Sequence, residues 1–232
     1  MKASIKPWHE RLYFLAMIGC IQFVILTLIA MVFYPGGTHE DPTTKGYSFF
    51  HNFFSDLGLT ETFSGDPKFA SFLLFTVAMV LAGVALAFFF VAFPSFFSSS
   101  TLGKWLSILG SIAGILSGLA FIGVALPGNL YLDPHKLSVQ VAFLAFFVAV
   151  LIYIPVIFLK RDYPRVYAWV FVAFALLLGA YVWLLFEGPS TITSTGLIIQ
   201  ATGQKIIVYA TIISMFIQSY GAWKITKGKS PT

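Results

Sequence analysis

The polar side chains that could do chemistry are gathered in a few short stretches of an otherwise apolar chain. One stretch follows the first apolar run, and in it His51 and Ser55, and likewise Asn52 and Asp56, are four residues apart. This spacing puts each pair on one face of a helix, while phenylalanines occupy the other face. We therefore expect a short helix over 47–57 whose polar face carries these four candidate ligand-binding residues.

Two further stretches add a histidine and an amide–amine pair. His135 begins a later apolar run, and Gln204 and Lys205 lie near the start of the last one. Catalytic zinc sites use three protein ligands, histidine and carboxylate among them, and keep one position for water. One hypothesis is therefore a zinc site formed by His51, Asp56 and His135. The competing interpretation gives these residues capping, interfacial and interhelical roles and needs no cofactor.

The composition restricts the class of protein. Of the 232 residues, 58% are apolar, 18% aromatic and only 10% charged, and 26 are phenylalanine. A soluble domain is about one quarter charged. These values exclude a soluble enzyme, a disordered chain and a nucleic-acid-binding module, and the net charge of +5 is scattered between apolar runs. We expect an integral membrane protein with membrane lipids, and no nucleic acid, as partners.

Six apolar runs are long enough to cross a membrane, because a spanning helix needs about 20 apolar residues. Proline and glycine mark most of their ends. The expected spans are about 11–34, 67–93, 103–126, 136–159, 165–187 and 197–222. The sequence thus predicts an all-α polytopic membrane protein, with six transmembrane helices in one bundle and a single domain over 1–232. The helix over 47–57 is too short to span, so we expect it to be interfacial or re-entrant.

Basic residues are distributed unequally between the two ends of such a bundle. If the six spans alternate in direction, ten of the 14 lysines and arginines lie on the side of the two termini. The positive-inside rule then places both termini in the cytoplasm of a multi-pass cell-membrane protein. The other four bases, and the polar stretches described above, lie on the outer side. These four are Lys45, Lys68, Lys136 and Lys205.

The third expected span contains Gly110, Gly114 and Gly118 at four-residue spacing. Small residues at this spacing let membrane helices approach closely. Two interpretations stay open for this row. The glycines either form a contact within the bundle, or they form the interface of a homo-oligomer or of a partner membrane subunit.

Several of these residues together resemble a known family. They are Asn52-Phe-Phe-Ser-Asp-Leu-Gly58 after the first span, Gly123 to Pro127 followed by His135, and the Gln204-Lys205 pair. The pattern resembles an uncharacterised six-helix membrane family of archaea and bacteria (a domain of unknown function), which is similar to the eukaryotic DRAM/Frag/Sfk group. The resemblance covers nearly the whole chain. It implies the six-helix fold and a lipid-related setting, and it implies no reaction.

Three functions are compatible with the sequence, and it does not decide whether the protein is an enzyme. The first is lipid binding or membrane organisation with a polar site on the extracytoplasmic side, which the aromatic-rich outer helix and the absence of deeply buried charge favour. The second is an intramembrane zinc-dependent lipid hydrolase. The third is a transporter or an accessory subunit of a membrane complex. No acidic residue lies at the centre of a span, which disfavours ion-coupled transport.

Overall fold

The computed structural model describes residues 7–228, and its regular secondary structure within that range is helical. All six long helices are apolar and long enough to cross a membrane, which confirms the predicted six-helix membrane fold. The long helices are α1 (Pro7–Val32), α2 (Phe69–Ala92), α3 (Thr101–Gly123), α4 (Leu132–Leu159), α5 (Val166–Glu187) and α6 (Ser194–Lys227). Two short 3₁₀ helices complete the set, η1 (Phe54–Gly58) and η2 (Phe93–Phe96).

The predicted spans differ from the observed helices mainly at their ends. Helix α6 begins at Ser194 and ends at Lys227, whereas the apolar run predicted 197–222. Its first turn is stabilised by Thr193, whose side chain accepts a hydrogen bond from the backbone N–H of Gly196. Its last turn contains Lys224 and Lys227, and positive charges there stabilise a helix because they interact with the negative end of its dipole. Such polar end residues extend a helix beyond the apolar run that reveals it.

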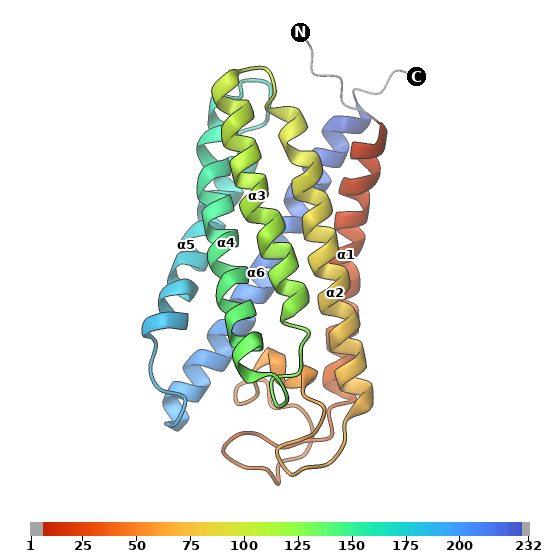
Figure 1. Ribbon diagram of the computed structural model, residues 1–232, viewed down its shortest axis with the longest axis vertical. Coiled ribbons are helices and arrows are strands. Elements are labelled where there is room, and N and C mark those ends of the chain that lie inside the picture. The colour runs from red at the N-terminus through yellow and green to blue at the C-terminus, as the bar shows by residue number, and fades with distance from the viewer. Residues whose placement is uncertain (1–6, 229–232) are drawn as a thin grey trace.

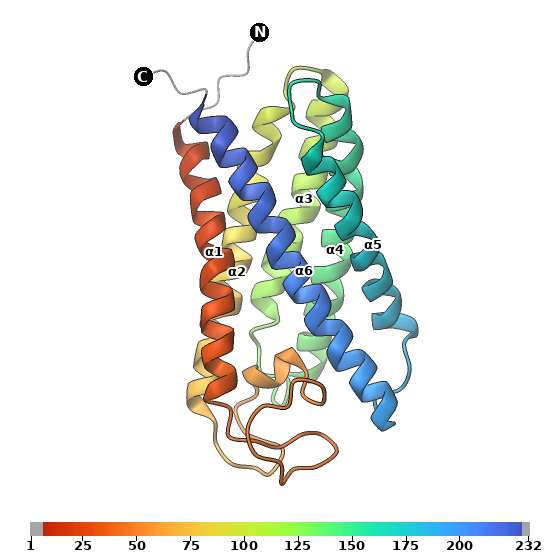
Figure 2. The ribbon, with the colours of Figure 1, turned by 180° about the vertical axis from the view of Figure 1, so that it is seen from behind.

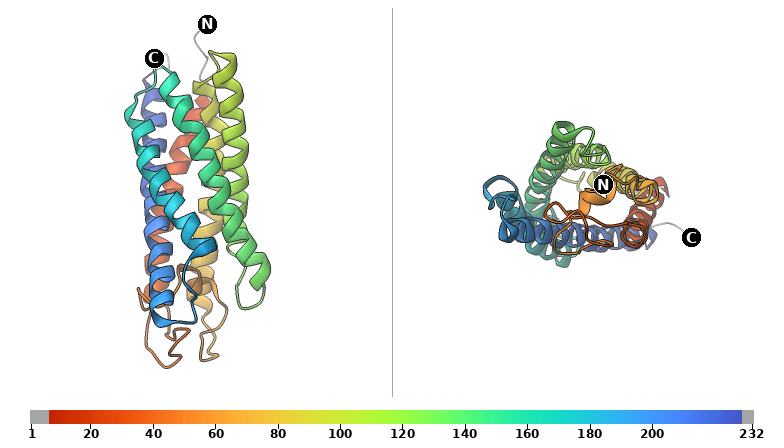
Figure 3. Two further views of the ribbon diagram at one scale, coloured as in Figure 1. Left: turned by 90° about the vertical axis from the view of Figure 1, so that its left-hand side faces the viewer. Right: turned by 90° about the horizontal axis from the view of Figure 1, so that it is seen from below.

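The six helices form a closed ring in chain order. Each helix packs against the next one in the sequence, and α6 returns to pack against α1. The view from below shows the helices arranged around a common interior (Figure 3, right). Side chains from all the helices fill much of this interior, and the largest of them are aromatic. Fully buried examples are Tyr13, Phe75, Phe89, Phe90, Phe146, Tyr153 and Phe171.

Helix α6 crosses the bundle diagonally. Its 34 residues extend for about 51 Å at 1.5 Å per residue, longer than a hydrocarbon core of about 30 Å. It lies beside α1 where α1 begins and beside α5 at the opposite end of the bundle (Figures 1 and 2). The segment 33–68 lies at that opposite end, and its η1 contacts α1, α2 and α6. The first outer loop therefore lies over the end of the ring where α1 and α6 diverge.

The predicted helix over 47–57 is correct in place and wrong in length. Only Phe54–Gly58 is helical, as a 3₁₀ helix, and turns precede it. The Asn52 side chain accepts from the backbone N–H of Ser48, and the Asp56 side chain accepts from that of Phe53. Hydrogen bonds from short polar side chains to nearby backbone compete with regular helix. The residues that suggested a polar helix face thus hold a compact turn instead.

Helix α1 begins, and helix α6 ends, at the same end of the bundle (Figure 1). This agrees with spans that alternate in direction. Lys2, Lys6 and Lys229, which entered the charge comparison, lie outside the described residues. At the opposite end, Lys68 and Lys205 are buried. The cytoplasmic location of the termini stays a prediction that rests on the charge distribution.

The glycine row on α3 is buried against helices of the same chain. A Cβ at Gly110 would lie 2.9 Å from the ring of Tyr153 on α4, and one at Gly114 would lie 2.2 Å from the ring of Phe90 on α2. At Gly118 it would lie 2.7 Å from the backbone oxygen of Gly83 on α2. The structure thus shows the intramolecular contact for these three glycines, and a contact with a second chain stays a prediction.

We expect Gly83→Ala to destabilise the bundle. The added Cβ would lie 2.5 Å from the backbone oxygen of Gly118, so α2 and α3 must separate, at a cost of about 1–3 kcal/mol. Thermal unfolding in detergent micelles measures this as a lower midpoint. Gly128→Ala is the matched control, because its Cβ meets nothing closer than 3.6 Å. Equal midpoints for the two variants would contradict the close helix approach.

Candidate functional site

Residues 47–59, which we call the plug, form a compact unit at the end of the ring opposite the beginning of α1; we refer to this end as the outer end, after the predicted topology. Its most deeply inserted side chain is Phe54, which is buried and stacks on Phe23 of α1 with ring centroids 5.7 Å apart. The Phe54 ring also contacts Phe75 of α2 and Tyr209 of α6, at 6.3 and 5.8 Å. The plug therefore reaches into the interior of the bundle through an aromatic side chain.

The carboxylate of Asp56 organises the plug from within. One of its oxygens, Oδ2, accepts hydrogen bonds from the backbone N–H of Phe53, at 2.8 Å, and from Nδ2 of Asn52, at 3.1 Å. Asp56 is 7% exposed. A buried carboxylate needs such donors, because without them burial of its charge is very costly. The bond to Phe53 also fixes the first turn of η1.

Asn52 joins the plug to the beginning of the same loop. Its Nδ2 lies 2.9 Å from the carbonyl oxygen of Gly37 and 3.3 Å from the hydroxyl of Tyr34, and its Oδ1 accepts from the N–H of Ser48 at 2.9 Å. Gly37 has a φ of +86°, a conformation that glycine adopts readily, and its carbonyl also accepts from the Tyr34 hydroxyl. Asn52 is fully buried, so this amide acts as an internal cross-link.

Two buried lysines supply donors to the plug backbone. Lys68, just before α2, donates through Nζ to the carbonyl oxygens of Asp56 and of Leu57, the latter at 3.1 Å. Lys205 on α6 donates to the carbonyl oxygens of Asn52 and, at 3.1 Å, of Ala201. Their exposed fractions are 2% and 0%. The expected absence of deeply buried charge is therefore wrong, because carbonyl acceptors make these two positions tolerable.

Aromatic faces complete the surroundings of both ammonium groups. Nζ of Lys68 lies 4.5 Å from the ring centroid of Tyr34. Nζ of Lys205 lies 5.5 Å from that of Tyr47 and 5.3 Å from that of Phe49. A cation within about 6 Å of a ring face is attracted by its quadrupole. Each lysine is thus held by carbonyl oxygens and an aromatic face.

Neutral hydrogen bonds tie the plug to the same two helices. Gln204 of α6 accepts from the backbone N–H of Phe54 through Oε1, at 2.6 Å. Ser71 of α2 donates to the carbonyl oxygen of Leu57 at 3.1 Å. The adjacent pair Gln204-Lys205 therefore holds one side of the plug, and Lys68 with Ser71 holds the other.

Burial shifts the pKa of Asp56 in the plug and of Lys68 beside it. Loss of hydration raises the pKa of the Asp56 carboxyl from 3.8 to about 6, against the lowering effect of its hydrogen bonds and of the two lysines. Loss of hydration likewise lowers the pKa of Lys68 from 10.5 to about 7, although Asp56 opposes this. Neither lysine approaches the Asp56 carboxylate as an ion pair; in residues 7–228 the pair within 4.0 Å is Lys160–Asp162.

The contacts of the plug explain why Asp56, Leu57 and Gly58 of the Ser-Asp-Leu-Gly motif suit their positions. Asp56 caps η1, and Leu57 is fully buried while its carbonyl receives Lys68 and Ser71. Gly58 lies against Phe75, where an added Cβ would be 2.5 Å from the ring. Leu57 and Gly58 are therefore restricted by the packing of the plug on α2, and Asp56 by its hydrogen bonds within the plug.

The structure joins four of the seven predicted site residues in one hydrogen-bond network, whereas the ring nitrogens of the two histidines have other partners. Asn52, Asp56, Gln204 and Lys205 form the network described above. Nδ1 of His51 is 3.0 Å from Oγ of Ser48, and Nδ1 of His135 is 2.9 Å from the carbonyl oxygen of Leu126. Ser55 faces the interior.

The part of the chain that the structure describes contains no group of three His, Cys, Asp or Glu side chains placed to hold a metal ion. His51, Asp56 and His135 are thus not brought together as a ligand set in this conformation. The zinc hypothesis stays a prediction, for which metal analysis of the purified wild type and of His51→Ala is the test.

Sequence reasoning missed Lys68, Tyr34 and Tyr47 as members of the site. The hydroxyl of Tyr47 donates to the carbonyl oxygen of Phe53 at 3.1 Å. A lysine at the start of a span is usually an interfacial residue whose ammonium group reaches water, so the sequence did not indicate that Lys68 is buried. The available signal was Asp56 itself, because an anion in a phenylalanine-rich segment requires a partner.

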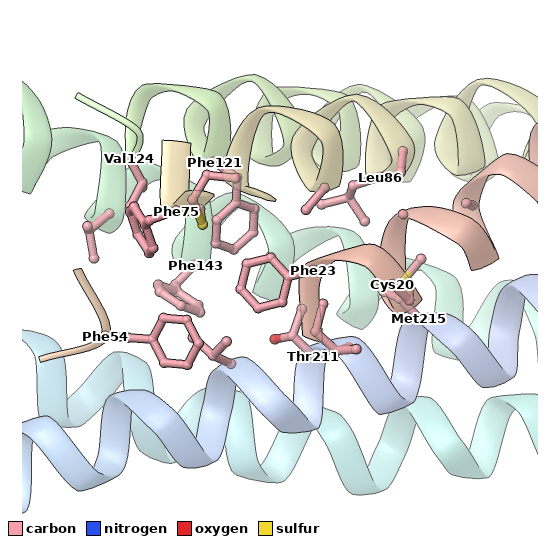
Figure 4. Close-up of a pocket in the computed structure, with 18 of the residues that line it drawn as sticks. Cys20, Phe23, Phe54, Phe75, Leu86, Phe121, Val124, Phe143, Thr211 and Met215 are labelled. Atoms are coloured by element: carbon pink, nitrogen blue, oxygen red, sulfur yellow. The ribbon is translucent and has the colours of Figure 1, made fainter. Parts of the chain in front are cut away.

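A cavity lies inside the ring next to Phe54 of the plug (Figure 4). Its lining comes from α1, α2, α3, α4, α6 and the plug, and it is almost entirely apolar. The volume that the centre of a water-sized sphere can occupy inside it is about 80 Å³, and the cavity is partly open to the surroundings. Phe23, Phe54, Phe121 and Phe143 face one another around it, with Cys20 and Met215 toward one end.

Comparisons of this chain with protein-family models, with curated proteins and with solved structures found no match in any of the three. The resemblance to the six-helix family and to the DRAM/Frag/Sfk group therefore stays a prediction. What the chain can do has to be argued from the plug and from the cavity beneath it.

We expect Asp56→Ala to be the most damaging alanine substitution of an acidic residue. It removes the acceptor of a backbone N–H and of the Asn52 amide in a buried place, which costs about 1–3 kcal/mol. Thermal unfolding in micelles should show this as a clearly lower midpoint. Glu61→Ala is the control, since Glu61 is exposed and its loss should cost less than about 0.5 kcal/mol. Similar midpoints for the two variants would show that the hydrogen bonds of Asp56 contribute little to stability.

Acid should close the plug more tightly. The pKa of Asp56 is about 6 in the closed plug and 3.8 when exposed, so closing takes up a proton between these values. The protonation of Asp56 therefore stabilises the closed plug fully below pH 3.8, and this stabilisation is lost as pH rises through about 6. Hydrogen exchange of the 47–59 amides, corrected for intrinsic rates, should show about 1 kcal/mol more protection near pH 5 than near pH 7.

Asp56→Asn is the control for this pH dependence, because it keeps an acceptor for the N–H of Phe53 and cannot titrate. Lys68 also faces the carboxylate, and its pKa is lowered to about 7. Its loss of a proton therefore begins to favour closure as pH approaches 7, which opposes the Asp56 effect and slightly reduces the difference. Lys205 is the other charged neighbour. An undiminished difference in Asp56→Asn would assign the effect to another group.

Proposed function

We propose that this integral membrane protein binds the hydrocarbon chain of a lipid inside its helix ring, with the plug as the polar cover of that site. The observation that carries the proposal is the apolar cavity under Phe54. Pockets that bind small molecules are concave, mostly apolar and bordered by a few placed polar groups. The cavity meets this description, because its lining is apolar and Ser55 and Gln204 border it on the side of the plug.

Part of the cavity lining consists of small side chains, which leave the interior unfilled. The lining there includes Ala16, Gly19, Ala82 and Ala85 on the facing sides of α1 and α2. Unfilled apolar space costs free energy, about 24 cal/mol per Å³ in the cores where it has been measured, because lining atoms lose dispersion contacts. An alkyl chain would restore these contacts. Lipid is the solvent of this protein, so such chains are always present at high concentration.

The distribution of charge supports an orientation for this activity. The basic residues near the beginning of α1 and the end of α6 would face the cytoplasm by the positive-inside rule, and the plug would then face the extracytoplasmic side of a cell membrane. Exposed bases at the inner end would attract anionic headgroups. These residues are Arg11, Lys104, Arg161, Arg165, Lys224 and Lys227.

The lone cysteine offers a direct readout of occupancy. Cys20 is the single cysteine of the chain, it is buried, and its side chain lines the cavity. A bound alkyl chain should therefore slow the alkylation of Cys20 by a lipophilic maleimide. No engineered cysteine is required for this measurement.

We expect Val208→Phe to abolish binding of an alkyl chain by filling the cavity. Val208 lines the cavity from α6, and the larger ring would occupy the space of the ligand. The measurement is photolabelling in nanodiscs by an alkane that carries a diazirine, with mass spectrometry to locate the adducts. Adducts on lining residues such as Phe23 and Met215 should fall several-fold, while adducts on outward-facing residues stay constant.

Ile206→Phe is the matched control, because Ile206 lies on the same helix but is 56% exposed to the membrane side. It should leave the labelling of lining residues unchanged. If the wild type showed no adducts on lining residues, or if both variants labelled alike, the proposed function would be wrong.

A further inference from the structure

Helix α6 carries a stripe of buried polar side chains, two of which line the cavity inside the ring. Thr211, Ser214, Gln218 and Ser219 follow at intervals of three, four and one residues, which keeps them on one side of a helix. Their exposed fractions are 8%, 3%, 0% and 0%. A polar stripe inside an apolar bundle needs a reason, because buried polar groups are costly unless they are hydrogen-bonded.

The hydroxyl groups of this stripe have no hydrogen-bond partner among residues 7–228. This holds for Oγ1 of Thr211, Oγ of Ser214 and Oγ of Ser219. Some other buried hydroxyls are satisfied locally, since Thr27 and Thr226 each donate to the carbonyl four residues earlier, whereas others, such as those of Thr76 and Thr202, are also unpartnered among the described residues. An unsatisfied buried hydroxyl costs about 1–3 kcal/mol. The stripe therefore presents free hydrogen-bonding capacity to the interior.

Two of the unpartnered hydroxyls belong to the cavity. Thr211 and Ser219 both line it, and Figure 4 shows the Thr211 side chain projecting from α6 toward the space between the aromatic rings. Eight residues separate the two positions, which is about 12 Å along a helix. The cavity thus offers one hydrogen-bonding point near its aromatic part and a second one two turns away.

The lining carries no charged side chain. The charged residues next to lining residues in the sequence are Asp56 of the plug and Lys205 of α6, and both are engaged in the hydrogen bonds described above. A carboxylate or phosphate inside the cavity would lose its hydration and gain no opposite charge, which is strongly unfavourable. An uncharged oxygen would lose much less and could pair with a hydroxyl.

We propose that the occupant of the cavity is an uncharged amphiphile, an alkyl chain with a hydroxyl or ester oxygen that hydrogen-bonds Thr211, with Ser219 as the second polar point. The inference rests on the proposed function and deepens it by naming the ligand class. The alkyl part fills the space between Phe23, Phe54 and Phe143, and the oxygen satisfies a hydroxyl that the protein leaves unpaired. Lipids with a charged headgroup are excluded from the cavity by the same arrangement.

The test compares three photoactivatable probes that share one alkyl chain with a diazirine, namely hexadecane, hexadecanol and ionised hexadecanoic acid. The full chain is reconstituted in dioleoylphosphatidylcholine nanodiscs, and adducts on lining residues are quantified by mass spectrometry at equal probe content. Hexadecanol should label the lining about threefold to tenfold more than hexadecane, the effect of one net hydrogen bond. The ionised acid should label it least.

Thr211→Val should remove the preference for hexadecanol and leave hexadecane labelling unchanged. Because it deletes an unpaired hydroxyl and nearly keeps the shape, it should not lower the unfolding midpoint. Thr202→Val is the matched control, since Thr202 is on the same helix, is also unpartnered among the described residues and does not line the cavity. Ser219→Ala should reduce the preference less than Thr211→Val does.

The outcomes separate this inference from the proposed function. Equal labelling of the lining by all three probes, or strongest labelling by the acid, would overturn the uncharged amphiphile while leaving alkyl binding in place. A preference for hexadecanol that persists in Thr211→Val would overturn the assignment of its partner. No labelling of the lining by any probe would overturn the proposed function itself.

Discussion

The arrangement at the outer end depends on two lysine ammonium groups that satisfy backbone carbonyls of the plug. Irregular backbone at the mouth of a membrane bundle leaves carbonyl oxygens without partners, and each costs several kcal/mol if it stays unpaired in apolar surroundings. Lys68 and Lys205 reach the plug from α2 and α6, on opposite sides. A lysine suits this task because a flexible stem carries three donors at its tip. Without these donors, a stable insertion of Phe54 among the helices is difficult to explain.

The plug and the ring together account for the cavity. Helix α6 leaves α1 as it crosses the bundle (Figure 2), and η1 packs between α1, α2 and α6 at the outer end. Further inside, α1 and α2 approach so closely that a Cβ at Gly19 would lie 2.2 Å from Cβ of Ala85. Small residues needed for that contact also line the cavity. The empty space is therefore a consequence of close packing on one side and a tilted helix on the other.

The sequence predicted the spans well because an apolar run of sufficient length has few alternatives in lipid. It also singled out Asn52, Asp56, Gln204 and Lys205, since polar residues are scarce and their positions stand out; the structure joins them in one hydrogen-bond network, and their role in ligand binding stays a prediction. It failed for the helix over 47–57, where the same polar side chains bind backbone instead, and for Lys68. The cavity and its inward hydroxyls depend on how helices of different tilt pack, which no local pattern contains.

Two sets of polar groups inside this bundle are physically distinct. Those of the plug are charged or strongly polar, they satisfy one another, and they lie at the end of the bundle where an opening of the loop would admit water. Those of the α6 stripe, such as Thr211 and Ser219, are uncharged and unpaired among the described residues, and they lie deeper. Buried charge thus lies at the loop end of the bundle, whereas Thr211 and Ser219 border the apolar cavity, where an entering molecule could satisfy their hydroxyls. Under the proposed function, an alkyl chain that carries an uncharged hydrogen-bonding atom would match this lining better than one that carries a charge.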